Sequence, residues 1–426
     1  MKQISFFITA YILTCININA QYRPSDDVYP DAVFEGNIKT SRIFKEGWEM
    51  SYPIYHFNDE TPLIVTFDEI SKNARYYSYS IIHCDADWRQ SRFATSEYMT
   101  GFPTNRIKKY EYSFNTVMPY VHYRLTIPNE DVQLKVSGNY AVVVYEDGYE
   151  NRPVLCRRFS VVEPYTVVSA HAGPARQTAR QNEWQQVDFT VRTVNYNIEN
   201  AYNDVKVAVL QNGIWNTART NVKPLFVRQN ELDYRFIDQT LQFLAGNEYR
   251  IIDLKSKQYS STRMAAIEFA PPTWHFFPYL DLSRATSRYV YYEDWNGKYS
   301  IQAERTSNPD TEADYVYVHF VLTAAQPFPD AQVYVTGEFC NNGYSIENLM
   351  RYNSEERQYE ARILLKQGYY NYRYSLLSSK SITDDYQLEG NFYDTENDYV
   401  IYIYHRGRSS RYDRLIGVSI VNALKD

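Results

Sequence analysis

The strongest constraint on the fold is a series of short stretches, spread along the chain, in which apolar and polar residues alternate with a period of two. Such alternation is typical of β-strands that turn one face toward a core. Turn residues separate the stretches at the spacing expected of β-sandwiches. The clearest examples are residues 61–70, 75–84, 110–116, 120–128, 139–147, 184–193, 204–213, 247–254, 297–305, 314–323, 331–339, 358–365, 369–377 and 398–406.

Prolines and polar segments mark the seams between groups of these strands. The seams are Pro164, the Pro271-Pro272 pair and residues 307–314, and the second boundary is broad because residues 270–297 fit either neighbour. A chain of 426 residues suits two to four domains at about 100–200 residues each. We therefore predict an all-β protein with three consecutive immunoglobulin-like or early-set β-sandwich domains. Their predicted ranges are 21–164, 165–290 and 291–426.

Composition supports sheets that are exposed on one face. The chain has 43 Tyr against 21 Phe, and its mean hydropathy is −0.53 although 44% of its residues are hydrophobic. Tyrosine can bury its ring while its hydroxyl stays in water, which suits a half-buried pleated surface. The 44 Lys and Arg against 51 Asp and Glu give a net charge of −7, spread along the chain. This balance argues against a nucleic-acid partner, which would favour a basic face.

The first twenty residues read as a secretory signal peptide. Lys2 supplies the charged start, residues 4–16 are apolar, and Ala20 before Gln21 is a plausible cleavage site. The apolar run is shorter than the ~20 residues that a spanning helix needs. We expect an exported protein without a membrane span. The three cysteines of the mature chain are too few for a disulfide framework, although one bridge stays open.

The stretch "YSYSIIHCDADWRQS" at residues 77–91 gathers a histidine, a cysteine and two aspartates. On a strand, His83, Asp85 and Asp87 would share one face, where an imidazole and two carboxylates can hold a divalent cation. The same parity begins with core-like tyrosines and isoleucine, so we favour the polar end of a core strand over a contact surface or a metal site. Asp85, Asp87 and Trp88 are then candidates for a loop that supports the fold or contacts a partner.

Motifs of catalysis are missing from the sequence. It has no glycine-rich phosphate loop, no G-x-S-x-G elbow and no H-E-x-x-H pair. The other histidines lie scattered among strands and loops. We assign no catalytic, cofactor-binding or metal residue and expect no enzyme.

Residues 333–377 resemble the early-set sandwich attached to glycogen- and starch-active proteins, through a "G-x-F" turn and a hairpin ending in "GYYNYRY". Those modules commonly place a tryptophan after the turn, where its flat ring stacks on sugar. Here the turn reads "GEFCNNGY", without tryptophan. The resemblance implies the fold, and it motivates the alternative hypothesis of an exported carbohydrate-binding protein.

A dozen short segments in order carry a resemblance that covers almost the whole chain. They include "YSYSIIHCDADWRQS", "EYMTGF", "SGNYAVVVYED", "VLQNGIWNTA", "NELDYRF", "LKQGYYNYRY", "EGNFYDTENDYVIYIYHR" and "RYDRLIG". Together they resemble the type IX secretion system plug protein family of the Bacteroidetes.

The resemblance implies a non-enzymatic periplasmic protein that associates with the outer membrane. A plug of this kind docks on the very large translocon barrel, of SprA or Sov type, and closes it until a substrate protein engages. The implied membrane association is indirect, through the barrel, and no cofactor, small-molecule substrate or nucleic acid is implied. Tyrosine-rich surfaces suit such contacts, since aromatic residues are enriched at protein interfaces.

Overall fold

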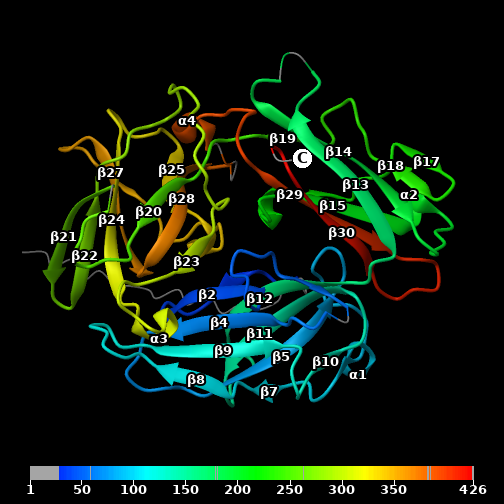
Figure 1. The fold of residues 1–426 in the computed structure, drawn as a ribbon, viewed down its shortest axis with the longest axis horizontal. Helices are drawn as coiled ribbons and strands as arrows, with labels where there is room; N and C mark the ends of the chain where they lie inside the picture. The colour runs from blue at the N-terminus through cyan, green and yellow to red at the C-terminus, as the bar shows by residue number, and fades with distance from the viewer. Residues whose placement is uncertain are drawn as a thin grey trace, which may run out of the picture.

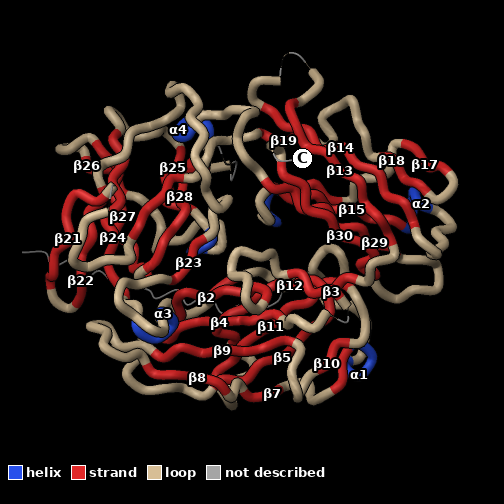
Figure 2. Tube along the Cα trace, viewed as in Figure 1, coloured by secondary structure: helices blue, strands red, loops and turns tan. Residues whose placement is uncertain are grey.

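The computed structural model describes residues 28–424 apart from positions 58, 178, 180, 262, 381, 382 and 384. The signal peptide predicted for residues 1–20 lies outside the described residues. Strands dominate the described part of the chain, and its helices are single turns. The strands gather into three modules arranged around a common centre (Figure 1, Figure 2). The prediction of an all-β protein built from sandwiches is confirmed.

The N-terminal module is a sandwich of two sheets around one core. Its elements are β1 (Ala32–Val33), β2 (Ile38–Lys45), β3 (Ile54–His56), β4 (Leu63–Glu69), β5 (Tyr77–Cys84), α1 (Thr95–Tyr98), β6 (Met99–Thr100), β7 (Asn105–Arg106), β8 (Lys109–Tyr112), β9 (Val121–Ile127), β10 (Gln133–Leu134), β11 (Gly138–Glu146) and β12 (Pro153–Val162). One sheet has the order β1-β12-β11-β5-β7, with β3 parallel to β12, and the other has the order β2-β4-β9-β8. Strands β6 and β10 form a small separate pair.

The middle module is a second sandwich. Its elements are β13 (Thr166–Pro174), β14 (Trp184–Thr193), α2 (Ala201–Asp204), β15 (Val205–Gln211), η1 (Trp215–Thr217), β16 (Arg219–Thr220), β17 (Phe226–Arg228), β18 (Glu231–Asp233), β19 (Gln242–Leu244), β29 (Asp398–His405) and β30 (Arg414–Asn422). The order β13-β14-β18-β17, with β19 also on β14, forms one sheet, and β16-β15-β29-β30 forms the other. Both sheets contribute to one buried core.

The third module completes the molecule. Its elements are β20 (Arg250–Asp253), β21 (Met264–Ala270), β22 (Thr273–Pro278), β23 (Tyr299–Ile301), α3 (Pro309–Glu312), β24 (Tyr315–Thr323), β25 (Ala331–Thr336), η2 (Glu338–Cys340), β26 (Arg351–Asn353), β27 (Gln358–Lys366), β28 (Gly368–Ser378) and α4 (Tyr386–Glu389). Strand β28 pairs with β20, β23 and β25, and it faces the sheet β21-β22-β24-β27-β26 across the core.

The division of the chain differs from the predicted ranges 165–290 and 291–426. Strands β20 to β22 come before residue 291 but belong to the third module, because β20 pairs with β28 and β22 with β24. Strands β29 and β30 come last in the chain but belong to the middle module, because β29 pairs with β15. The third module is thus inserted between β19 and β29. Alternation identifies a strand but not its partner, so the pattern alone favoured neighbours in sequence.

The tyrosine side chains are more deeply buried than the composition predicted. Many tyrosines are fully buried rather than half-exposed, and several of their hydroxyls donate hydrogen bonds inside the protein. Tyr140 donates to the Val136 carbonyl at 2.7 Å, and Tyr374 donates to Asp281 at 2.8 Å. The largest fully buried side chains are Tyr77, Tyr79, Tyr120, Tyr123, Tyr140, Tyr234, Tyr299, Tyr315, Tyr370, Tyr372, Tyr374 and Tyr399.

Candidate functional site

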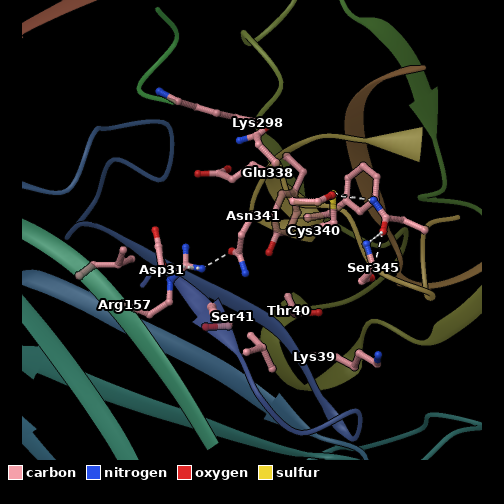
Figure 3. A pocket seen from close by; sticks show the side chains of 18 of the residues that line it. Asp31, Lys39, Thr40, Ser41, Arg157, Lys298, Glu338, Cys340, Asn341 and Ser345 are labelled. Carbon is pink, nitrogen blue, oxygen red and sulfur yellow. Dashed lines mark hydrogen bonds and ion pairs between the residues drawn. The ribbon is translucent and has the colours of Figure 1, made fainter. Parts of the chain in front are cut away.

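The three modules meet around a cavity of about 620 Å³ (Figure 3). Its wall combines residues 30–36 and strand β2 of the N-terminal module with residues 212–216 of the middle module. Residues 296–299 and 338–348 of the third module close the remaining side. Because each module supplies part of the wall, the cavity depends on how the modules are assembled.

One wall of the cavity carries a charged contact between two modules. Arg157 of β12 lies 3.2 Å from the Asp31 carboxylate and also donates to the Asn341 side-chain oxygen in the third module. Figure 3 draws this group between β12 and the loop after η2. The Arg157 side chain is almost fully buried. The contact therefore joins the N-terminal and third modules beside the cavity.

Lys298 forms a second contact of this kind at the cavity. Its ammonium group donates to the Met50 carbonyl and lies 3.7 Å from the centre of the Tyr52 ring. Burial lowers the pKa of Lys298, while the carboxylates of Glu338 and Asp398 act in the opposite direction. The lysine of the third module is thus held against the N-terminal module by a carbonyl and an aromatic face.

The structure separates the residues of the proposed His-Asp-Asp face. Strand β5 ends at Cys84. His83 points into the core, where its ring nitrogens contact the Ser91 hydroxyl at 2.8 Å and the Ser137 carbonyl at 3.2 Å. Burial lowers the pKa of His83 to about 4. Asp87 is exposed and pairs only weakly with its neighbour Arg89, at 3.4 Å. His83 and Asp87 therefore do not converge.

Trp88 is a buried contact between modules. A turn closes when the Trp88 amide donates to the Asp85 carbonyl at 2.9 Å, and Trp88 has a φ of 65°. Its ring, 4% exposed, meets the edge of Trp215 in the middle module at 5.0 Å. The Arg158 guanidinium lies 4.5 Å from the Trp88 ring. Trp88 thus fixes the turn against the middle module.

Asp85 reaches the same module through charges. Its carboxylate forms an ion pair with Arg406, which lies just after β29. Asp413, before β30, accepts from the Ala86 amide at 2.9 Å and from Lys206 at 2.9 Å. Arg406 also lies 3.0 Å from Asp413. The turn predicted as a candidate loop is therefore part of the contact between the N-terminal and middle modules.

Sequence reasoning missed a buried charged cluster between the N-terminal and third modules. Lys366 of β27 lies 2.6 Å from the Asp68 carboxylate of β4, and both side chains are 1% exposed. Tyr315 donates to Asp68 at 2.7 Å, and His122 contacts it at 2.7 Å. Burial tends to raise the pKa of Asp68, but Lys366 and His122 outweigh it and hold that pKa below its usual value. The pair spans 298 residues, so no local pattern could reveal it.

The described part of the chain offers little chemistry beyond these contacts. Within it, no three or more His, Cys, Asp or Glu side chains are placed to hold a metal ion, and no helix is long and apolar enough to cross a membrane. Cys84, Cys156 and Cys340 are free thiols. Cys340 lines the central cavity, and burial raises its pKa to about 11. Its thiol is therefore protonated at neutral pH.

Comparison with known proteins places these features in a family. Residues 38–163 match the family model of the type 9 secretion system plug protein first domain. The solved structure of a hypothetical protein from Parabacteroides merdae ATCC 43184 is 37% identical, with 93% of this chain and 99% of that chain covered and a TM-score of 0.89. The chain belongs to the type IX secretion system plug family. No match is found among curated proteins.

The match to the plug family's first domain coincides with the N-terminal module. The matched range begins at Ile38, the first residue of β2, and ends one residue after β12. It contains the turn at residues 85–88 and the buried Asp68. Two of the contacts by which this plug protein's first module holds its other two modules therefore start within the matched range.

Proposed function

We propose that this plug-family protein is a non-enzymatic gating subunit that closes the outer-membrane translocon barrel of type IX secretion. The observation that carries the proposal is the family match over residues 38–163. In this proposal the protein works in the periplasm after export and associates with the membrane only through the barrel, of SprA or Sov type.

The contacts between modules support this role. A plug must keep its outline when a substrate protein or an osmotic difference pushes on it. Here buried contacts at two junctions, Asp68 with Lys366 and Trp88 with Trp215, hold the N-terminal module to the other two. Since packed cores and interfaces resist continuous deformation, the three sandwiches would act as one body. Such a body closes a pore by its shape and needs no reacting group.

Deletion of the gene in its native host tests the proposal. We expect the outer membrane to become permeable to large hydrophilic molecules, because the open barrel is no longer closed, and a plasmid copy to restore the barrier. The measurement is uptake of a large hydrophilic dye or antibiotic by deletion, complemented and wild-type cells. Normal permeability of the deletion strain would contradict the gating role.

Affinity purification from solubilised membranes tests the partner. A tagged copy of the protein is expected to retain an outer-membrane barrel of unusual size, identified by mass spectrometry. A tagged periplasmic protein of similar size serves as the control. Absence of the barrel from the tagged sample, at the level of the control, would contradict the partner assignment while leaving the permeability result to be judged on its own.

A further inference from the structure

Two short linkers form the neck between the middle and third modules. Because the third module is inserted between β19 and β29, residues 245–249 lead into it and residues 390–397 lead out of it. The linkers run side by side, since the Phe392 amide donates to the Gly246 carbonyl at 2.8 Å and the Gly246 amide donates to the Asn391 side chain at 2.7 Å. A change in the angle between the two modules at this neck must therefore displace the linkers.

Three carboxylates meet in the neck, and each comes from a different segment. Glu248 lies on the entering linker, Glu396 on the returning linker, and Asp294 on the connection between β22 and β23. The Glu396 amide donates to Oε1 of Glu248 at 2.9 Å, and the Tyr289 hydroxyl donates to the same oxygen at 2.5 Å. Asp294 accepts from the amide of Tyr249, the residue after Glu248. These bonds tie the three segments together at one place.

The surroundings of Glu248 are poorly suited to a negative charge. Glu248 is fully buried, and its second carboxylate oxygen, Oε2, has no hydrogen-bond partner among the described residues. The neighbouring Arg284 guanidinium donates to the Glu389 carboxylate and to the main-chain carbonyl of Glu248, each at 2.7 Å, rather than to the Glu248 carboxylate. Burial raises the pKa of Glu248, and burial together with the charge of Glu248 raises the pKa of Asp294 to about 7. Two carboxyl groups in such surroundings retain a proton that exposed ones would lose.

Most of the groups around Glu248 and Asp294 are neutral or acidic. Deprotonation of this carboxyl pair therefore adds negative charge to surroundings that already carry several carboxylates. The charged and titratable groups around the pair are Arg284, Tyr289, Tyr291, Tyr292 and Glu293 of the connection between β22 and β23, Tyr369 of β28, Glu389 of α4, and Asp394 and Glu396 of the returning linker.

We propose that Glu248 and Asp294 share one proton and that this carboxyl pair is a pH-dependent latch between the middle and third modules. The shared proton supplies the donor that Oε2 of Glu248 lacks, so the neck is held closed while the proton is bound. Loss of the proton leaves two negative charges in the neck, and the linkers open to water more often. The latch does not depend on the gating role.

The direction of the pH dependence follows from the two states of the neck. In an open neck both carboxyl groups titrate near their usual values of about 3.9 for Asp and 4.3 for Glu. In the closed neck the pair keeps its proton up to about pH 7. The closed neck is therefore favoured in acid, and this advantage is lost as the pH rises from about 4 to about 7.

Hydrogen exchange of the full protein between pH 5 and 8 tests the latch. The probes are the amides of the two linkers, with each rate divided by the intrinsic exchange rate at that pH. Since one proton is bound only in the closed neck, the opening constant should rise by up to about tenfold per pH unit between about pH 5 and 7 and should level off above about pH 7. Amides of β9, in the N-terminal module, are the internal reference and should show no such rise.

Glu248→Gln is the decisive variant. Its side-chain amide puts a permanent N–H donor in place of Oε2, so the opening constant of the linkers should lose its dependence on pH. Glu293→Gln is the matched control, because Glu293 is exposed and adjacent to Asp294, and it should keep the wild-type response. The proposal is overturned if the linkers of the wild type and of Glu248→Gln respond to pH alike.

An infrared difference spectrum of the folded protein gives a second readout. The C=O stretch of a protonated carboxyl group should be present at pH 6 and lost by pH 8 in the wild type and in Glu293→Gln. Asp294→Asn should lack this change. A wild-type spectrum with no such loss would also overturn the proposal.

Discussion

Lys366 and Asp68 place two opposite charges in a fully buried contact between the N-terminal and third modules. Lys366→Ala would leave the Asp68 carboxylate buried without its ammonium partner, which costs about 3–5 kcal/mol in free energy of unfolding. The double variant Lys366→Met/Asp68→Asn should recover most of that loss, because neither charge remains. Urea denaturation gives the free energy of unfolding of the wild type, the single variant and the double variant. Lys108→Ala, at an exposed pair, is the control and should change little. An equally small change for Lys366→Ala would refute the assignment.

The same pair has a defined pH dependence. The pKa of Asp68 is lower in the folded protein than its usual value of about 3.9. The contribution of Asp68 to stability is therefore fully present above that usual value and is lost as pH falls through the lower folded pKa. The difference in unfolding free energy between wild type and Asp68→Asn should shrink as the pH falls below about 4. A difference in unfolding free energy that grows as the pH falls would contradict the predicted direction.

Single residues could be selected as candidates from the sequence only where they belong to a local pattern. The alternation through residues 77–84 ends in a polar turn, and this pattern directed attention to Asp85, Asp87 and Trp88. It could not say that Arg406 and Trp215 would be the partners of Asp85 and Trp88, because those residues come from other parts of the chain. Asp68 and Lys366 carried no signal, since each reads as an ordinary charged residue at the end of a strand.

Among the elements, β29 near the end of the chain contributes buried side chains to the core of the middle module. Ile401 of β29 is fully buried in the middle core. Ile401→Ala should cost about 2–5 kcal/mol in free energy of unfolding, through lost burial and the cavity that remains. Hydrogen exchange should quicken in β14 and β15 but not in β24 or β27. Ile420→Ala, at an exposed position of β30, is the control and should stay within about 0.5 kcal/mol. Faster exchange confined to the third module would contradict the assignment of β29.

The positions of strands could be predicted from the sequence because alternation is a local pattern. The strands with which they pair could not be predicted, because pairing partners lie elsewhere in the chain. The stretch 398–406 was expected as a strand and is one. Its alternate residues fill two cores, since Ile401 and Ile403 face the middle core while Val400 and Tyr402 face the junction with the N-terminal module. A strand buried on both sides reads like any apolar run, so its place between two modules depends on contacts distant in sequence.

For the whole molecule, the arrangement of the modules depends on contacts at both junctions of the N-terminal module. Trp215→Ala/Lys366→Ala removes one contact at each junction, so the modules should separate more often while each keeps its own core. We expect unchanged far-ultraviolet circular dichroism at 20 °C but a larger radius of gyration by small-angle X-ray scattering. Asp87→Ala/Lys108→Ala, at exposed positions, is the control and should match wild type.

If closing the barrel requires one rigid body, the same double variant has a consequence in cells. Cells that carry Trp215→Ala/Lys366→Ala in place of the wild-type gene should admit large hydrophilic molecules at a rate between wild type and the deletion strain, at equal protein level. Equal levels, checked by immunoblot, separate a loosened plug from a degraded one. A larger radius of gyration with an intact permeability barrier would show that rigidity is dispensable. An unchanged radius of gyration would instead indicate that the apolar contacts around Tyr402 hold the modules together.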